Sequence, residues 1–281
     1  MDNKLAPALF LELDAQKKPG WFPKPGALAD ELRKKTVKGK GSGNFRLPSS
    51  DSILFATAAV EMWLRAVHSF LISSSLEKAS PIWSSISGYY ASHYVMRAFA
   101  HLHGHFLLRG EGQHVNISPG KAKSYLCEFK KESTNEHKFY WKLVNSVPMF
   151  SQDCLFSDNN DHLQPTDTSH RGFANYKDHV DHFQDFMTLN EEYLITRIRR
   201  VSELMTDSPT LPNHNKYPDL DSVHIIAYAR IVRFRSYVDE MIGTKNRYWR
   251  YYRSPGWFTK YMDFQTVEPS PTATLASVPV Q

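Results

Sequence analysis

The stretch DSILFATAAVEMWLRAVHSFLIS (51–73) decides the fold of this 281-residue chain. Its apolar residues recur every three or four positions, as one face of a helix requires, and Ser49 or Ser50 can cap its first turn. After the polar turn SSSLEKAS, Pro81 suits the first turn of a second helix that runs to about His103. The short connection predicts that these two helices pack as antiparallel partners.

Alternation of apolar and polar residues replaces helical spacing further along the chain. SYLCEF (124–129) and HKFYWKLV (137–144) both alternate, and the polar turn KKESTNE joins them, which predicts a β-hairpin. QHVNI (113–117) can add a third strand. We therefore expect a mainly α (α+β) fold, a helical bundle with an inserted β-hairpin or small three-stranded antiparallel sheet at about 113–145.

The two ends of the chain are predicted to be less structured than its middle. Residues 1–48 predict an irregular basic lead-in, with turn-rich KKPGWFPKPG and flexible KGKGSGNFRLP on either side of a short helix at ALADELRKK. Residues 265–281 are rich in Pro, Ser and Thr, and a disordered tail is expected. Residues 49–264 then form a single helical domain. Its last helices are expected near 177–187, 191–205 and 221–242.

Composition narrows the class of protein. Hydrophobic residues make up 41% and charged residues 22%, the balance of a globular protein with a core. No run of about 18 apolar residues is present, so neither a spanning helix nor a membrane partner is predicted. The first residues break their apolar stretch at Pro7 and Glu12 and lack a basic start, which argues against a signal peptide. Cys127 and Cys154 have no CxxC spacing, and two thiols suit a reducing, cytoplasmic location.

Charge is unevenly spread along the chain, although the formal net charge is only +5. Nine Lys or Arg stand against two acids between Lys17 and Arg46, and eight stand against two between Ala227 and Lys260. The segment 151–192 between them holds nine acidic residues against two basic ones. This basic, acidic, basic pattern fits a polyanion partner for the basic parts, or pairing of the acidic middle with the basic ends.

Polar residues form a stripe along the second helix. His93, Arg97 and His101, with His105 beyond, are spaced four apart and lie on one helical face. One imidazole could take the 2′-hydroxyl proton of RNA, another could protonate the leaving oxygen, and Arg97 could stabilise the phosphate transition state. The alternative is a polar seam buried between helices, with Arg97 paired to an acidic residue of 151–192.

The same region, SSISGYYASHYVMRAFAHLHGHFLLRG (84–110), resembles the YYA…RA…G helix of HEPN-domain proteins. The resemblance implies a small helical bundle from a family found in prokaryotic toxin–antitoxin and antiviral defence systems, many of whose members cut RNA. Active members carry an Arg, usually followed by a polar residue, and a His four to six positions later. Arg97 and His103, with five residues between them, match this spacing, whereas Ala98 follows the arginine. The candidate catalytic residues of a ribonuclease are Arg97, His103, His101 and His93.

RYWRYYRSPGWFTKY (247–261) mixes basic and aromatic residues and contains no acid. Basic side chains contact phosphates and aromatic faces stack on unpaired bases, so the mixture suits single-stranded nucleic acid. In the alternative interpretation the rings pack onto the core and the arginines stay solvated. YARIVRFRS (228–236) adds basic residues to the same region. The candidate nucleic-acid-binding residues are Arg247, Arg250, Arg253, Trp249, Tyr252 and Arg233.

YKDHVDHFQDF (176–186) places His179 and His182 about one helical turn apart, and with Asp178 or Asp185 they could chelate a divalent ion. The sequence points to no ligand from a second element, and an exposed amphipathic helix explains the same residues. No metal and no cofactor is therefore predicted.

Three hypotheses of different classes follow from these features. The first is a HEPN-like RNA-binding protein or metal-independent ribonuclease, acting on RNA or single-stranded nucleic acid in a prokaryotic defence or toxin system. The second is a non-catalytic helical subunit that binds a protein partner within a homo- or hetero-oligomer. The third is a metal-dependent enzyme built around His179 and His182.

Overall fold

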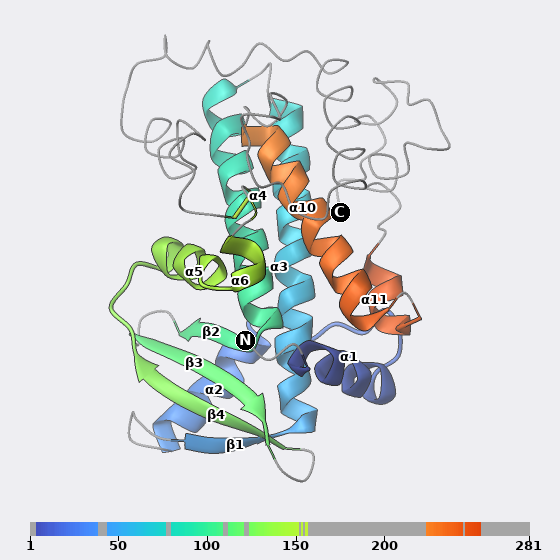
Figure 1. Ribbon diagram of the computed structural model, residues 1–281, viewed down its shortest axis with the longest axis vertical. Coiled ribbons are helices and arrows are strands. Elements are labelled where there is room, and N and C mark those ends of the chain that lie inside the picture. Colours follow the sequence, from blue (N-terminus) through green and yellow to red (C-terminus); the bar gives the residue numbers. More distant parts are fainter. Residues whose placement is uncertain are drawn as a thin grey trace. The chain divides into compact units, whose positions relative to one another are not determined.

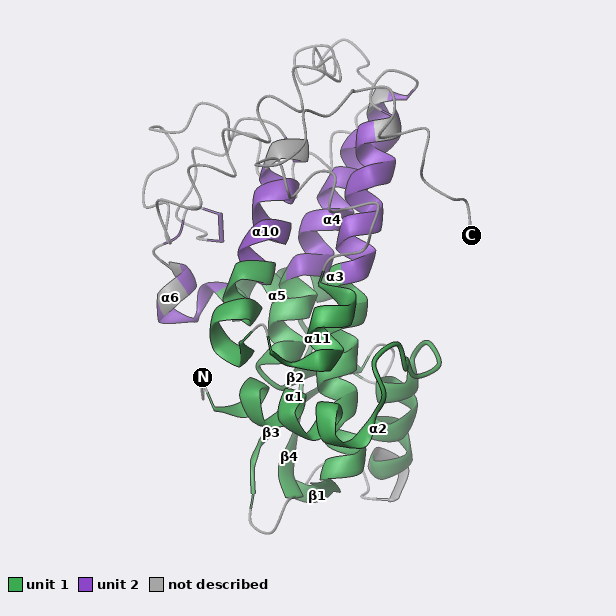
Figure 2. Ribbon diagram, turned by 90° about the vertical axis from the view of Figure 1, so that its right-hand side faces the viewer, with its two compact units in different colours: residues 1–63, 96–144, 235–253 green, residues 64–95, 145–234, 254–281 purple. Residues whose placement is uncertain are grey.

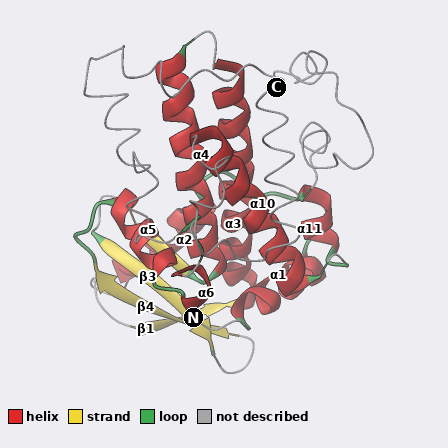
Figure 3. Ribbon diagram, turned by 45° about the horizontal axis from the view of Figure 1, so that its top comes forward, coloured by secondary structure: helices red, strands yellow, loops and turns green. Residues whose placement is uncertain are grey.

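The computed structural model describes residues 4–38, 44–76, 80–108, 112–120, 124–151, 153, 155–156, 223–243 and 245–253. Within them the protein is mainly helical and has one small four-stranded antiparallel sheet (Figure 3). The predicted α+β fold class is therefore confirmed, with four strands in the sheet. The tail 265–281, the predicted helices at 177–187 and 191–205, and the pair His179 and His182 lie outside the described residues. The extent of the predicted domain, 49–264, stays a prediction.

Helices and strands follow one another as labelled in Figure 1. The helices are α1 (Leu5–Gln16), α2 (Ala27–Lys38), α3 (Ser49–Leu76), α4 (Pro81–Leu102), α5 (Glu136–Asn145), α6 (Pro148–Ser151), α10 (Val223–Ile242) and α11 (Arg247–Tyr252). The strands are β1 (Asn44–Pro48), β2 (His105–Leu108), β3 (Gln113–Pro119) and β4 (Ser124–Lys131). The predicted helices at 51–73, at 81–103, at ALADELRKK and at 221–242 are thereby confirmed, with small shifts at their ends.

The chain divides into two compact units (Figure 2). Unit 1 comprises residues 1–63, 96–144 and 235–253, and unit 2 comprises 64–95, 145–234 and 254–281. By sequence, unit 1 holds 23 Lys and Arg against 13 Asp and Glu, whereas unit 2 holds 11 against 16. The two basic parts of the sequence therefore fall mainly in one unit, and the acidic segment falls in the other.

In unit 2, α3 and α4 are joined by reciprocal hydrogen bonds. Ser73 Oγ donates to the Ser84 carbonyl at 2.7 Å, and Ser84 Oγ donates to the Ser73 carbonyl at 2.6 Å. Phe70 of α3 packs against Tyr228 of α10 with ring centroids 5.5 Å apart. The predicted antiparallel pairing of the first two long helices is confirmed by these contacts at their connected ends (Figure 1).

In unit 1 the sheet has the strand order β1-β4-β3-β2, and each neighbouring pair is antiparallel. The register places Ile117 opposite Cys127, and both are buried. Side chains alternate between the two faces of a strand, so the pair Arg46 and Leu126 points to the opposite face, where both are exposed. The sheet therefore has one buried face and one polar face.

Residues 137–144 form most of helix α5, so the prediction of a strand there is wrong. Asn135 starts the helix, because its Oδ1 accepts a hydrogen bond from the backbone N–H of His137 at 2.9 Å. Phe139, Tyr140 and Val144 are the buried residues of α5, a set that helical spacing puts on one face. In a run this short the apolar residues fit both periods, and packing selects the helix. The hairpin partner of β4 is β3, where the third strand was predicted.

The prediction of an irregular lead-in is wrong for two of its segments. Helix α1 buries Leu5, Leu9 and Leu13, which are spaced four apart on one face. Pro7 lies in the first turn, where a proline removes no helical hydrogen bond. Strand β1 comes from the stretch predicted as a flexible loop, and pairs with β4 along all five of its residues.

The turn from α4 into β2 depends on Gly104. Its φ of 80° lies in the left-handed region that glycine tolerates, and its N–H bonds to the His101 carbonyl at 2.9 Å. A Cβ at this position would lie 2.8 Å from the Ile117 carbonyl oxygen, so only glycine fits without a shift of β3. This turn fixes the histidines on either side of it.

Within α3, Ser49–Ser74 is long and apolar enough to cross a membrane by length and composition. However, 67% of its most apolar window is buried inside the protein. Packing within the fold accounts for this composition, because a core helix has the same properties.

Candidate functional site

Arg97 of α4 is held in unit 1 by an ion pair. Its Nη1 lies 3.3 Å from Glu136 Oε1 of α5, and the two side chains are only 17% and 10% exposed. The guanidinium also lies over the Tyr140 ring, 5.5 Å from its centroid. The geometry therefore favours the alternative of a paired arginine, and the partner among the described residues is Glu136 of α5.

His101 and His103 are buried at the end of α4 in the same unit. His101 Nδ1 donates to the His105 carbonyl oxygen at 2.9 Å, and its ring stacks on Phe106 at a centroid distance of 4.9 Å. His103 Nε2 lies 3.1 Å from the hydroxyl of Tyr237 in α10. Both rings therefore make contacts that fix them within the fold.

The buried environment keeps these two imidazoles neutral. Burial, with the charge of Arg97, lowers the pKa of His101 to about 3, and burial lowers the pKa of His103 to about 4. At pH 7 neither ring carries the extra proton that a general acid must deliver to a leaving oxygen. The arrangement therefore suits an architectural role better than RNA cleavage.

His93, the fourth candidate catalytic residue, belongs to unit 2. It is 1% exposed, and its ring lies parallel to that of Tyr89 with centroids 6.3 Å apart. The sequence places it on the same helical stripe as Arg97, but the structure encloses it in aromatic packing.

Two further histidines meet on the polar face of the sheet. His105 Nδ1 of β2 lies 2.9 Å from His114 Nε2 of β3, and the edge of the His114 ring packs against Phe139 of α5. Burial lowers the pKa of His105 to about 3 and lowers that of His114. Sequence spacing pointed to His105 but not to His114, because only the β2–β3 register brings the two together.

The predicted nucleic-acid-binding residues do not share one environment. Trp249 is fully buried, packs edge-on against Trp63 and Phe10, and donates its Nε1–H to Asp239 at 2.7 Å. Arg233, in unit 2, is also buried, and its Nε lies 3.1 Å from Asp153 Oδ2. In these positions neither side chain is presented to a ligand from solvent.

Two aspartates hold the ends of α11. Asp239 accepts the Nε–H of Arg253 at 2.8 Å and makes a second bond with its Nη2. Asp14 of α1 lies 3.4 Å from Arg247 Nε and accepts the backbone N–H of Tyr248 at 3.1 Å. These contacts fix α11 on the rest of unit 1 and partly neutralise Arg247 and the C-cap residue Arg253.

The segment KKPGWF (17–22) packs against the outer side of α11. Phe22 meets Tyr252 edge-on at 5.4 Å, and the Tyr252 hydroxyl donates to the Trp21 carbonyl at 3.2 Å. A Cβ at Gly20 would lie 3.2 Å from the Tyr251 ring, so this tyrosine lies over the turn.

The surface formed by 17–22 and α11 is termed the aromatic–basic surface below. Its exposed members include Lys18, Arg250 and Tyr251, which is 59% exposed. Lys17 adds a cation 4.4 Å from the Trp21 ring. Two basic, aromatic segments from opposite ends of the sequence thus form one surface.

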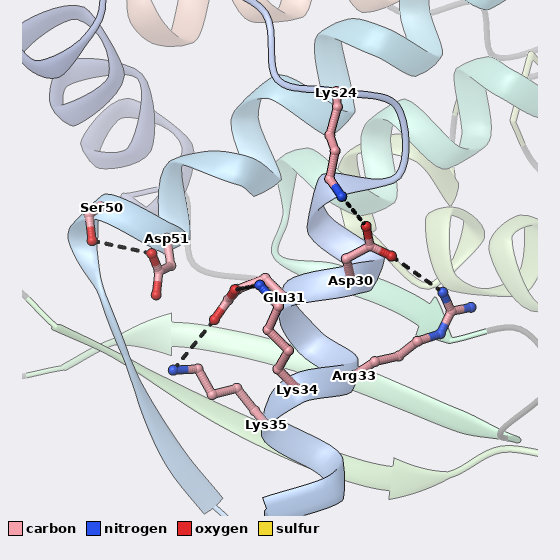
Figure 4. Close-up of polar contacts among 8 residues, drawn as sticks. All are labelled: Lys24, Asp30, Glu31, Arg33, Lys34, Lys35, Ser50 and Asp51. Atoms are coloured by element: carbon pink, nitrogen blue, oxygen red, sulfur yellow. Dashed lines mark hydrogen bonds and ion pairs between the residues drawn. The ribbon is translucent and has the colours of Figure 1, made fainter.

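The cations of α2 behave differently, as Figure 4 shows. Asp30 pairs with Lys24 at 3.0 Å and with Arg33 at 3.8 Å, and these charges lower the pKa of Asp30. Glu31 pairs with Lys34 at 3.1 Å and with Lys35 at 3.5 Å. Two acids of α2 therefore pair with four cations of the lead-in, namely Lys24 before the helix and Arg33, Lys34 and Lys35 within it.

No family model matches this sequence, and no curated protein or solved structure matches it. The HEPN resemblance of residues 84–110 therefore stays a prediction. Among the described residues, no group of three or more His, Cys, Asp or Glu side chains is arranged to hold a metal ion.

Proposed function

We propose that this protein binds single-stranded nucleic acid, RNA in particular, through the aromatic–basic surface, and that it does not cleave RNA at Arg97. The observation that carries the proposal is the packing of residues 17–22 against α11, with Lys18 of that segment and Arg250 and Tyr251 of α11 all exposed.

Each exposed group has a distinct part in this binding. The Tyr251 ring offers a face for an unpaired base, and stacking of this kind contributes about 1–3 kcal/mol per base. Arg250 and Lys18 supply cations for the phosphates that flank that base. A base held in a duplex has no free face for the ring, so a single strand is preferred over a double helix.

The charge of unit 1 supports the same class of ligand. Its excess of 10 positive charges attracts a polyanion, and Lys18 and Arg250 are among its exposed cations. RNA is favoured over DNA by the HEPN resemblance, which also carries the proposed setting in prokaryotic defence. A protein partner and an oligomeric state stay predictions.

Catalysis at Arg97 is left out of the proposal for a geometric reason. A transition-state cation must reach the reacting phosphate, whereas Arg97 lies between Glu136 and Tyr140 with little exposure. His101 and His103, both buried and neutral, cannot act as the proton donor at pH 7.

The test compares two double variants of equal size in a binding titration with fluorescent single-stranded RNA. In Lys18→Ala/Arg250→Ala two cations of the aromatic–basic surface are removed, and in the matched control Lys138→Ala/Lys142→Ala two exposed cations of α5 are removed. We expect the first variant to weaken binding and to reduce the salt dependence, the slope of log K against log [salt], by about 1.4 units for a single strand.

The base-stacking step is tested by Tyr251→Ala, which should weaken binding of single-stranded RNA by about 5- to 150-fold, the equivalent of 1–3 kcal/mol. Equal weakening by the α5 control would show that the binding is unspecific, and unchanged binding in both the Lys18/Arg250 and Tyr251 variants would disprove the proposal. Cleavage of RNA by the wild-type protein that His103→Ala abolishes would restore the ribonuclease hypothesis.

A further inference from the structure

We propose that His105 and His114 form a two-histidine chelate for a divalent transition-metal ion, with Zn²⁺ as the expected ion. This site is separate from the aromatic–basic surface and does not depend on the proposed function. It rests on two imidazole nitrogens that converge on the polar face of the sheet, 2.9 Å apart.

The sheet register creates this convergence. His105 pairs with Asn116 across β2 and β3, and His114 pairs with Leu107, so the two histidines occupy diagonal positions on neighbouring strands. Because opposite residues of an antiparallel pair share a face and alternate residues return to it, both side chains lie on one side of the sheet. Both histidines have intermediate exposure, and His105 is the more buried of the two.

The observed separation is close to what a metal requires. Zn–N bonds of about 2.0–2.1 Å at a tetrahedral angle place two ligand nitrogens about 3.3 Å apart. The nitrogens of His105 and His114 need to separate by only about 0.4 Å and to tilt so that both lone pairs meet the ion. Without an ion the two nitrogens share a hydrogen bond. When an ion binds, the ring that donated this bond carries its proton on its other nitrogen, so both facing nitrogens can bind the ion.

Neighbouring groups hold the two ligands in place. The His101 Nδ1–H bonds to the backbone carbonyl of His105, and the Tyr140 hydroxyl accepts the backbone N–H of Leu107 at 3.1 Å. Phe139 restrains the His114 ring from the side of α5, with centroids 4.8 Å apart. Support of this kind for the residues around a ligand is typical of metal sites, where it sets ring orientation.

Two protein ligands leave two tetrahedral positions of the ion for water or for an atom of a second molecule. Structural zinc sites use four protein ligands, so this chelate is not expected to be needed for folding. An ion with open positions can instead bind an oxygen ligand such as a phosphate or carboxylate.

The experiment is a Zn²⁺ titration of the full chain in competition with a chromophoric chelator. Wild-type protein is compared with His114→Ala, with His105→Ala, with His68→Ala as an exposed histidine of α3, and with His179→Ala/His182→Ala. We expect either chelate variant to weaken one Zn²⁺ site by at least roughly tenfold. Replacing a residue that only hydrogen-bonds to a metal ligand already weakens metal binding by about this factor, and replacing the ligand itself should weaken it more. The other two variants should retain that site.

A spectroscopic measurement makes the assignment independent of affinity. Cu²⁺ prefers imidazole nitrogen and binds more strongly than Zn²⁺ at most such sites, so its electron paramagnetic resonance spectrum should report two nitrogen ligands in the wild type and one in His114→Ala. His114 is partly exposed on the sheet surface, and its replacement should leave the circular dichroism spectrum unchanged, so a folding failure of His105→Ala would not decide the result.

Three results would overturn the proposal. They are the absence of Zn²⁺ binding to the wild type, the loss of the site only in the His179/His182 variant, and a Cu²⁺ spectrum that His114→Ala does not change.

Discussion

The polar cluster at the end of α4 and the aromatic–basic surface on α11 have similar compositions but opposite environments. Arg97, His101 and His103 are enclosed by α5, β2 and α10, and each has a partner within unit 1. Helix α11 buries Tyr248 and Trp249 on one side and leaves other aromatic and basic side chains exposed.

The difference lies in what covers each helix, and not in the helix itself. The last turns of α4 contact α10 through Phe99 and Tyr237, contact α5 through Arg97 and Glu136, and continue into β2. α11 has only six residues and lies at the edge of unit 1, where a single turn-rich segment, 17–22, packs on its outer side. The types and helical spacing of residues therefore indicate a functional site only when the segments that pack over that helix are also known.

The sharpest way to test this comparison is to remove one buried and one exposed aromatic residue of α11. Trp249→Ala should lower the free energy of unfolding by about 3–5 kcal/mol, because the deleted ring leaves a cavity beside Trp63 and Phe10. Tyr251→Ala should change it by no more than about 0.5 kcal/mol, as is usual for an exposed position. Urea unfolding followed by circular dichroism measures both.

If Trp249→Ala instead left stability unchanged and weakened RNA binding, the ring would have to face solvent, and the division of α11 into a buried and an exposed side would be wrong. A large stability loss in Tyr251→Ala would count equally against it.

Sequence patterns predicted the long helices well because each pattern extends over many residues and depends on no residue from elsewhere in the chain. Over more than twenty residues, the apolar positions of α3 and α4 fit only a helical period, and Pro81 marks a start. The short elements were harder. In α5 the same apolar residues fit a strand, and β1 has only Phe45 and Leu47 as its apolar pair.

For the candidate site, the sequence could predict which types of residue take part but not which partners they contact. The spacing of Arg97 and His103 indicated a polar cluster, but no local signal names Glu136 or Tyr237 as their partners, since these lie far apart in the sequence. His114 was missed for the same reason. Residues 17–22 and α11 were each recognised as basic and aromatic, whereas their packing against each other depends on the tertiary fold.

A smaller effect is expected at Arg97, where the comparison predicts a structural and not a catalytic loss. Arg97→Ala removes the ion-pair partner of Glu136, and breaking a buried pair from one side costs about 3 kcal/mol, the lower end of the usual range, because the pair is slightly exposed. The double variant Arg97→Ala/Glu136→Gln should regain part of that loss, since it also removes the carboxylate charge. Urea unfolding gives the three values, and equal stability of wild type and Arg97→Ala would show that the pair is not formed.

The smallest expected effect is the pH dependence that His103 contributes. Unfolded histidine titrates near pH 6.5, whereas burial lowers the pKa of His103 in the folded protein to about 4. As the pH falls below 6.5 the unfolded state binds a proton first, so stability is lost between pH 6.5 and about 4 and changes little below that range. Between pH 7 and pH 5.5, which is one unit below the unfolded value, the loss due to this one residue is about 1.2 kcal/mol. His103→Gln keeps a polar partner for the Tyr237 hydroxyl but cannot titrate, so its stability difference between pH 7 and pH 5.5 should be smaller than that of wild type by this amount. His68→Gln, at an exposed position of α3, should keep the wild-type difference.

A catalytic imidazole open to solvent would titrate near its unfolded value and contribute no such difference, so identical pH profiles for wild type and His103→Gln would return His103 to the group of candidate catalytic residues.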